Sequence, residues 1–242
     1  RPFRAPHHTV SVQALTGGGR RPKPGEISLA TGGILFLDEF PEFSRAALET
    51  LRQPLEEREV TVSRVEASVT YPANFQLVAA MNPCPCGHFP DRSRCRCTDG
   101  QITRYLQKVS GPMLDRIDIC VEAAPITYGD IKSSGNNESS REIRARVEQA
   151  RKIQRERFAG ENVRCNGEMS GRHIRKFCWL GREEEKFMEE IFEKLALSAR
   201  MHDRILKVAR TTADLAEEEK IRLADLCEAV SYVKSRDKFW GN

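Results

Sequence analysis

The sequence predicts an α/β domain that is followed by a helical domain. Two short apolar runs, residues 34–37 and 75–81, have the length and composition of strands in a sheet. Toward the C-terminus, apolar residues recur instead at helical spacing. The polar residues 133–137, Ser-Ser-Gly-Asn-Asn, have the composition of a linker. We therefore expect an α/β domain with a parallel sheet in 1–134, a linker and basic connecting helix in 135–168, and a helical domain in 169–242.

The first part contains local signals for each of its elements. Residues Glu26–Ala30, between segments rich in Pro and Gly, predict a short helix. The four large apolar residues of Ile34–Leu37 predict a strand that is buried on both faces, as in a parallel sheet. Ser is a favourable helix N-cap, and apolar residues follow Ser44 at helical spacing as far as Leu55, so we expect a helix there.

Three further strand signals complete this part. Val60–Arg64 and Ser68–Tyr71 alternate with period two and predict a β-hairpin with its tip near residues 64–67. Phe75–Met81 is expected to form a second buried strand, and Ile117–Val121 a third. In a sheet built this way, ligands bind at the carboxyl ends of the strands.

The second part is helical throughout. A basic helix begins near Glu142, and one face of it carries Ile143, Val147, Ala150 and Phe158. Ser170 and Ser198 are suitable N-caps for later helices. Four further helices are expected near 170–179, 182–196, 198–217 and 222–235.

Composition limits the class of protein. Hydrophobic residues make up 39% of the chain and charged residues 31%, which is typical of a soluble globular protein. No apolar run reaches the ~18 residues of a membrane-spanning helix, and there is no signal-peptide pattern, so we expect a cytoplasmic protein without membrane contact. The first residue is Arg1 and not Met, which predicts a piece of a longer protein. The net charge of +4 is too small to indicate a nucleic-acid partner by itself.

Two carboxylates follow the first strand directly. Hydrolysis of a nucleoside triphosphate needs one carboxylate for Mg²⁺ and another to polarise the attacking water, and Asp38 and Glu39 are suitably placed for both. Asn82 follows the second strand, where its amide could bond the water or the γ-phosphate. The alternatives are a strand that ends in solvated acids and an ordinary turn at Asn82.

Two arginines are candidates for contact with the nucleotide. Arg116 is expected just before the third strand, where it could reach the nucleotide of a neighbouring subunit; the alternative is an ion pair with Asp115 or Asp118. Arg200 begins a helix on which Arg204 and Lys207 share its face. Such a row of basic residues is more often a solvated surface.

Four of the eight cysteines fall within fourteen residues, at Cys84, Cys86, Cys95 and Cys97. Four thiolates on one loop can hold a tetrahedral Zn²⁺ ion, and His88 could replace one of them. The absence of a signal peptide indicates a reducing compartment, in which a metal site is more typical than disulfides. The alternative is a set of free, reduced cysteines.

Several segments together resemble the magnesium-chelatase-like AAA+ ATPases, in particular their ComM (YifB) type. The resemblance covers nearly the whole chain. The motifs that carry it are Arg1–His8 (RPFRAPHH), Pro24–Ala30 (PGEISLA), Gly33–Glu39, Asn82–Gly87 (NPCPCG), Ser110–Asp118 and Ser198–Asp214.

The resemblance implies a role for each candidate residue. Asp38 and Glu39 would be the Walker B carboxylates, Asn82 sensor 1, Arg116 the arginine finger and Arg200 sensor 2. The fold would be part of an AAA+ P-loop NTPase core with a pre-sensor-1 hairpin, followed by a helical lid. The cofactors would be ATP and Mg²⁺, and the assembly a hexameric ring that drives branch migration on branched or single-stranded DNA in natural transformation.

One motif of the family is missing from these residues. No G-x-x-x-x-G-K-[ST] phosphate-binding loop occurs, and Gly17-Gly18-Gly19-Arg20 lacks its Lys-Ser/Thr pair. In the family this loop precedes the segment that resembles Arg1 onward. We therefore expect this chain alone to bind ATP weakly and not to hydrolyse it.

The nature of the client stays open at this point. Arg64 at the hairpin tip is the favoured DNA contact, because a ring-shaped motor grips a strand in its pore. The helix around Arg144, Arg146 and Arg151 is a weaker candidate, and we assign no chemistry to His7 and His8. Alternative readings are a chelatase-type motor that remodels a metal-insertion partner, and a zinc-stabilised binding module without catalysis.

Overall fold

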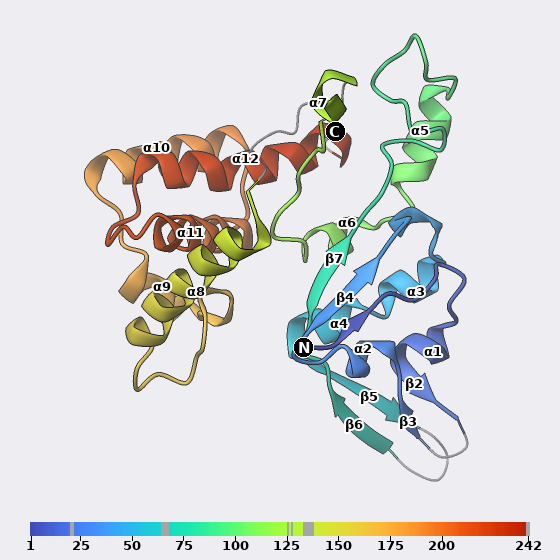
Figure 1. The fold of residues 1–242 in the computed structure, drawn as a ribbon, viewed down its shortest axis with the longest axis horizontal. Coiled ribbons are helices and arrows are strands. Elements are labelled where there is room, and N and C mark those ends of the chain that lie inside the picture. The colour runs from blue at the N-terminus through green and yellow to red at the C-terminus, as the bar shows by residue number, and fades with distance from the viewer. Residues whose placement is uncertain (20–21, 64–67, 125, 127, 133–137, 241–242) are drawn as a thin grey trace. The chain divides into compact units, whose positions relative to one another are not determined.

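The computed structural model describes residues 1–19, 22–63, 68–124, 126, 128–132 and 138–240 (Figure 1). The chain divides into two compact units, Arg1–Ile117 and Asp118–Asn242. In the described residues, the first unit contains the strands together with short helices, and the second contains only helices. The prediction of an α/β part followed by a helical part is confirmed.

Three parallel strands form the sheet of the first unit. They are β1 (Phe3–Arg4), β4 (Ile34–Leu37) and β7 (Gln76–Ala79), in the order β1-β4-β7. The central strand β4 is therefore paired on both sides. A Cβ atom on Gly33 would lie 1.9 Å from the carbonyl oxygen of Pro2, so only glycine lets β1 approach the start of β4 this closely.

Burial of the two predicted strands differs from the expectation. Leu35 and Leu37 are fully buried, whereas Ile34 and Phe36, on the opposite face, are only partly buried. The second strand is largely exposed, with Val78 36% accessible. The predictions of burial on both faces for Ile34–Leu37 and of a second buried strand at Phe75–Met81 are wrong, because in the described structure one face of β4 lies in the core and β7 is an edge strand.

The predicted helix after Ser44 consists of two short helices, α3 (Arg45–Glu49) and α4 (Arg52–Glu57). Ser44 is the expected N-cap, and its hydroxyl accepts from the backbone N–H of Ala47 at 3.2 Å. The interruption follows from Pro54, which has no N–H to continue the hydrogen-bond ladder of α3.

The hairpin and the first short helix are confirmed. Strands β5 (Glu59–Ser63) and β6 (Ser68–Pro72) are antiparallel, with Val60 opposite Tyr71, and the predicted tip, residues 64–67 with Arg64, lies outside the described residues. The remaining elements of the first unit are α1 (Val12–Thr16), β2 (Gly17–Gly18), β3 (Lys23–Pro24), α2 (Glu26–Leu29), a 3₁₀ turn (Phe40–Glu42), α5 (Asp99–Leu106) and α6 (Gly111–Leu114).

The third predicted strand is wrong. Residues 117–124 form neither helix nor strand, and Ile119 and Val121 are 51% and 69% exposed. The alternating apolar pattern of this segment is that of a strand, but a strand forms only where a neighbouring backbone supplies hydrogen-bond partners. Arg116 therefore follows the short helix α6 and does not precede a strand.

The helices of the second unit agree closely with the prediction. They are α7 (Tyr128–Lys132), α8 (Ser140–Arg157), a 3₁₀ turn (Asn166–Glu168), α9 (Gly171–Phe177), α10 (Arg182–Lys194), α11 (Ala199–Leu215) and α12 (Leu223–Trp240). Helix α11 packs against α8, α9 and α12 around an apolar core that includes Met188, Ile205 and Leu226 (Figure 1). The expected apolar face of α8 is buried at Ala150, but Ile143 and Val147 are 43% and 37% exposed.

A buried ionic network joins α8 to α11. Asp214 is completely buried and accepts hydrogen bonds from Arg157 and Asn166, at 2.7 Å and 2.8 Å. Arg210, only 2% exposed, donates from Nε to the same carboxylate, and its other nitrogens donate to the carbonyl oxygens of Glu218 and Glu219. The network ties α8, α11 and the turn after α11 together.

Candidate functional site

Asp38 and Glu39 lie at the carboxyl end of the central strand and are both exposed. The ends of β4 and β7 are joined there, because the Ala80 N–H donates to the Leu37 carbonyl and the Phe40 N–H donates to the Ala80 carbonyl, each at 2.9 Å. Glu39 has a left-handed backbone (φ 52°), and its N–H donates to Asp38 Oδ1 at 2.9 Å. The turn therefore holds two exposed carboxylates at one edge of the sheet.

Asn82 follows β7 at the same edge and is also exposed. A Cβ atom added to Gly87 would lie 3.7 Å from Cγ of Asn82, so the amide side chain lies against the backbone of Gly87. Gly87 has φ +79°, a conformation that glycine adopts without strain. The first turn of the cysteine loop thus lies beside Asn82.

His8 is a site residue that sequence reasoning missed. Its Nδ1 lies 2.9 Å from Glu39 Oε2, although His8 was given no role. The sequence could have suggested this contact only if the path of the residues after Phe3–Arg4, toward the end of β4, had been known.

Arg116 is nearly buried within its own unit. Its Nη2 lies 2.7 Å from Glu56 Oε1, its Nε donates to the Arg52 carbonyl at 3.2 Å, and the side chain is 10% exposed. The partner in the structure is therefore a residue of α4. Asp118, one of the predicted partners, pairs with Arg204 instead, at 3.0 Å.

Arg200 belongs to the second unit, in the first turn of α11, and is exposed. Ser198 caps that helix, and its hydroxyl accepts from the Met201 N–H at 3.2 Å. The first unit contains Arg116 and, at one edge of its sheet, Asp38, Glu39 and Asn82. Arg200 belongs to the second unit.

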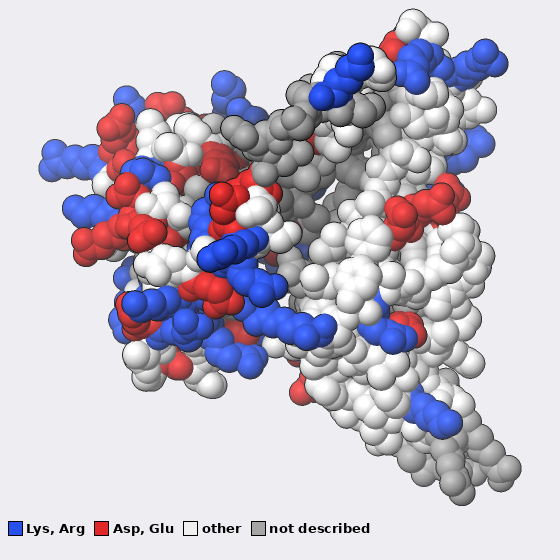
Figure 2. Space-filling view, in the orientation of Figure 1, with Lys and Arg blue, Asp and Glu red and all other residues white. Residues whose placement is uncertain are grey.

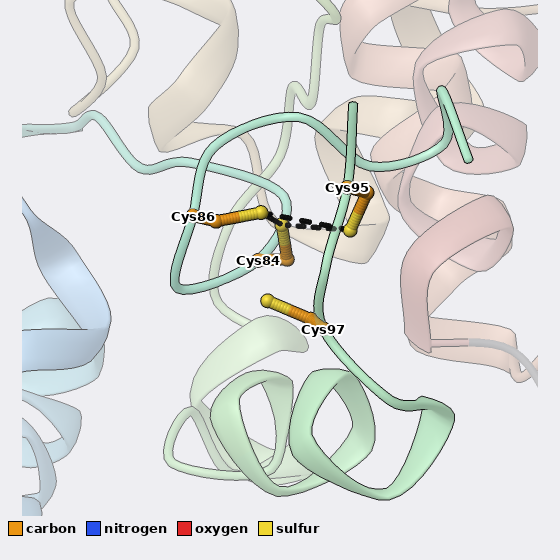
Figure 3. Close-up of side chains that lie close together, drawn as sticks. All are labelled: Cys84, Cys86, Cys95 and Cys97. Carbon is orange, nitrogen blue, oxygen red and sulfur yellow. Dashed lines mark hydrogen bonds between the residues drawn. The ribbon is translucent and has the colours of Figure 1, made fainter. Parts of the chain in front are cut away.

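The four clustered cysteines point their sulfur atoms at a common centre (Figure 3). Sγ of Cys84 lies 3.4 Å from Sγ of Cys86 and 3.7 Å from Sγ of Cys95, and all four sulfur atoms lie within 4.8 Å of one another. A tetrahedral ion with Zn–S bonds of ~2.3 Å places its sulfur ligands about 3.8 Å apart. The geometry therefore fits a four-sulfur metal site, and His88, which is exposed, is not needed as a ligand.

The loop that carries these cysteines is folded by its own hydrogen bonds. The Gly87 N–H donates to the Cys84 carbonyl at 3.0 Å, and the Cys95 N–H donates to the Asp91 carbonyl at 2.8 Å. A hydrogen bond from the backbone N–H of His88 lowers the pKa of the Cys86 thiol to about 6, whereas burial raises the pKa of Cys95 to about 11. One sulfur is thus readily ionised at neutral pH, which favours capture of a cation.

Charges on the helical unit are mixed. On the face shown in Figure 2, Lys and Arg side chains over the helices are interspersed with Asp and Glu. Helix α8 carries seven basic residues, which are interrupted by Glu142, Glu148 and Glu156, and its Arg146 pairs with Glu138 at 2.6 Å. A mixed surface of this kind is less suited to nucleic acid than a single-sign patch.

Comparison with known proteins identifies the class. The sequence model described as "Magnesium chelatase, subunit ChlI" matches residues 1–131, and "Magnesium chelatase, subunit ChlI C-terminal" matches residues 137–233. The chain therefore belongs to the magnesium chelatase ChlI family of AAA+ ATPases.

Individual relatives narrow the position of the chain within this family. The chain is 48% identical over 233 residues to the competence protein ComM of Haemophilus influenzae and 47% identical over 233 residues to YifB of Escherichia coli K12. Each match covers 96% of this chain and 45% of the relative, so the chain spans about half the length of these relatives. The magnesium-chelatase 67 kDa subunit of Heliobacterium mobile is 28% identical over 144 residues, which are 58% of this chain and 20% of that protein. The chain is a homologue of ComM and YifB.

None of the described helices is both long and apolar enough to cross a bilayer.

Proposed function

We propose that this chain is part of an ATP-driven DNA motor that promotes branch migration during recombination of incoming DNA. The observation that carries the proposal is the pair of exposed carboxylates, Asp38 and Glu39, at the carboxyl end of the central parallel strand. Ligands bind at this edge in open α/β sheets, so a nucleotide bound there would meet both carboxylates.

The residues at this edge have complementary chemistry for hydrolysis. Asp38 would hold Mg²⁺, and the ion would neutralise charge on the phosphates. Glu39 accepts the proton of the water that attacks the γ-phosphorus, while the bond from phosphorus to the leaving oxygen of ADP breaks. Asn82 donates from its amide to the same water or to the γ-phosphate. The oxygen and amide groups of these exposed side chains fit Mg²⁺ and phosphate.

The proposal also assigns roles to two arginines in a ring-shaped assembly. Arg116 acts on the nucleotide of the neighbouring subunit in a hexamer, and Arg200 acts from the helical unit, which serves as the lid. The Gly- and Lys-containing phosphate loop is absent from these 242 residues, so the active protein includes a further segment. We place the protein in the cytoplasm, where its reduced thiols are stable.

The cysteine cluster is proposed to hold Zn²⁺. Four sulfur atoms within 4.8 Å of one another match a closed, structural type of site that leaves no position for substrate. Because the loop begins two residues after Asn82, a bound ion would stiffen the backbone next to the nucleotide edge.

Contact with DNA is assigned to the hairpin of β5 and β6, with Arg64 as the gripping residue. The mixed charge of α8 makes that helix a weaker candidate. A chelatase-type motor is the second candidate, favoured by the 28% identity to a magnesium-chelatase subunit. The higher identity to ComM, 48% over 96% of the chain, supports the DNA motor.

The test is the ATPase rate of the protein that includes the phosphate-binding loop, measured with and without branched DNA. We expect stimulation by branched DNA and loss of turnover in Glu39→Gln. ATPase activity that ignores DNA would favour the chelatase-type motor. Absence of ATPase activity would contradict the proposal and favour a zinc-stabilised binding module.

A further inference from the structure

His8 lies directly beside the carboxylate of Glu39. The two residues approach because β1 runs parallel to β4, with Phe3 opposite Ile34 and Arg4 opposite Leu35. The residues after β1 therefore run toward the carboxyl end of β4, where Glu39 lies. The contact joins Nδ1 of the ring to Oε2 of the carboxylate at 2.9 Å.

The ring of His8 is itself held in place by its neighbours. It lies against the His7 ring, with a centroid distance of 4.1 Å and a tilt of 35°, and makes a T-shaped contact with Phe43 at 6.4 Å. His7 in turn contacts Thr9 Oγ1 through Nδ1 at 2.9 Å. A side chain packed on two rings loses little further freedom when it bonds a partner, so it can act as a fixed donor.

Glu39 is fixed at its backbone but has a side chain that is 57% exposed. Its N–H is bonded to Asp38 Oδ1, and its left-handed conformation sets the direction in which the side chain leaves the turn. An exposed glutamate without a side-chain partner samples several rotamers. His8 is the one partner that the structure records for its carboxylate in the described residues.

We infer that His8 is a positioning residue for Glu39. The ionised carboxylate can only accept, so Nδ1 of His8 carries the proton of this bond. With Oε2 held by His8, Oε1 remains to accept the proton of the attacking water. This inference rests on the proposed ATPase function, because a catalytic base must be oriented as well as present.

The ATPase test uses the protein with its phosphate-binding loop. His8→Ala is expected to lower kcat by roughly 10- to 100-fold, with little change in KM for ATP, because orientation and not binding is lost. His8→Asn should retain most of the activity, since its amide nitrogen occupies about the place of Nδ1. His8→Gln should not, because its amide nitrogen corresponds to Nε2.

Gln13→Ala is the control, because Gln13 is exposed on the nearby helix α1 and lies outside the contacts among His7, His8 and Thr9. Its kcat should equal that of the wild type. Wild-type kcat in His8→Ala, or an activity of His8→Asn as low as that of His8→Ala, would contradict the inference.

A second measurement needs no ATP and uses this chain as it is. Long-range ¹H–¹⁵N spectra of the imidazole should show the proton of His8 on Nδ1, and Glu39→Ala should shift it toward Nε2. A spectrum that Glu39→Ala leaves unchanged would overturn the His8 inference. A wild-type protein without ATPase activity would instead contradict the proposed function, so the two failures are distinguishable.

Discussion

Arg116 Nη2 lies 2.7 Å from Glu56 Oε1, and this ion pair holds the proposed finger against α4 of its own subunit. The side chain is only 10% exposed and also donates to the carbonyl of Arg52. Reaching a neighbour's nucleotide therefore requires Arg116 to exchange the Glu56 carboxylate for a phosphate oxygen. Both are anions that a guanidinium can bind through two nitrogens, so such an exchange keeps its charge paired.

A finger acting between subunits predicts complementation. In the protein with its phosphate-binding loop, Arg116→Ala and Glu39→Gln should each lower ATPase activity by about 10³-fold or more. Mixing the two variants should restore part of the activity. In a mixed ring, some sites combine Glu39 of one subunit with Arg116 of its neighbour. The check is the ATPase rate against mixing ratio, and a mixture no more active than either variant would contradict the finger role.

The cysteine cluster predicts about one equivalent of zinc in protein purified without chelator. Cys84→Ser should lose the metal, because it removes one of four sulfurs within 4.8 Å of one another. Cys227→Ser is the control, since Cys227 is exposed and outside the cluster. Elemental analysis measures the zinc content of the wild type and of both variants. Zinc well below one equivalent in the wild type would contradict the site.

Zinc retention should also depend on pH. The sulfurs must lose their protons to bind the ion, so affinity should fall as the pH falls. Without metal, Cys86 ionises near its pKa of about 6 and Cys95 near its pKa of about 11, and burial also raises the pKa of Cys97. Binding at neutral pH therefore releases protons mainly from Cys95 and Cys97. Calorimetry in buffers of different ionisation enthalpy measures this release, and binding without proton release would be inconsistent with thiolate ligands.

The buried network around Asp214 predicts a large stability effect in the helical unit. Asp214→Ala leaves the guanidinium groups of Arg157 and Arg210 without their common carboxylate. Breaking a buried ion pair on one side costs about 3–5 kcal/mol of unfolding free energy. Urea unfolding followed by tryptophan fluorescence reports on this unit, because both tryptophans, Trp179 and Trp240, belong to it.

Glu138→Gln provides the comparison for that measurement. It removes the ion pair with Arg146, whose side chains are 50% and 41% exposed, so a loss below about 1 kcal/mol is expected. Similar losses for the two variants would show that the Asp214 network does not support the packing of α8 on α11.

The chain by itself should not turn over ATP. Its 242 residues contain Asp38, Glu39 and Asn82 but no phosphate-binding loop, so the phosphates lack their backbone cradle and its Lys. Phosphate release from this chain should equal the rate without protein, and titration calorimetry should show only weak ATP binding. Turnover that Glu39→Gln abolishes would contradict this expectation.

Elements that form through contacts between residues close together in the sequence could be predicted. The Ser44 and Ser198 caps and the β5–β6 hairpin are in this class, because each depends on bonds within a few residues or across one turn. The strand expected at Ile117–Val121 did not form, because strand formation depends on a partner strand that the periodicity of a sequence does not reveal. The two-residue strand β1, which carries no readable period, was missed for the same reason.

By itself, the sequence determined that two carboxylates follow an apolar strand and that four cysteines crowd one loop, because both features are contiguous in the chain. Only the tertiary structure decided that His8 meets Glu39 and that Glu56 holds Arg116. The first contact depends on the parallel pairing of β1 with β4, which directs the residues after β1 toward the end of β4. The second depends on packing between α4 and the residues after α6. Neither arrangement leaves a periodic signal, because the paired residues are distant along the chain and each pair is brought together only when the first unit folds.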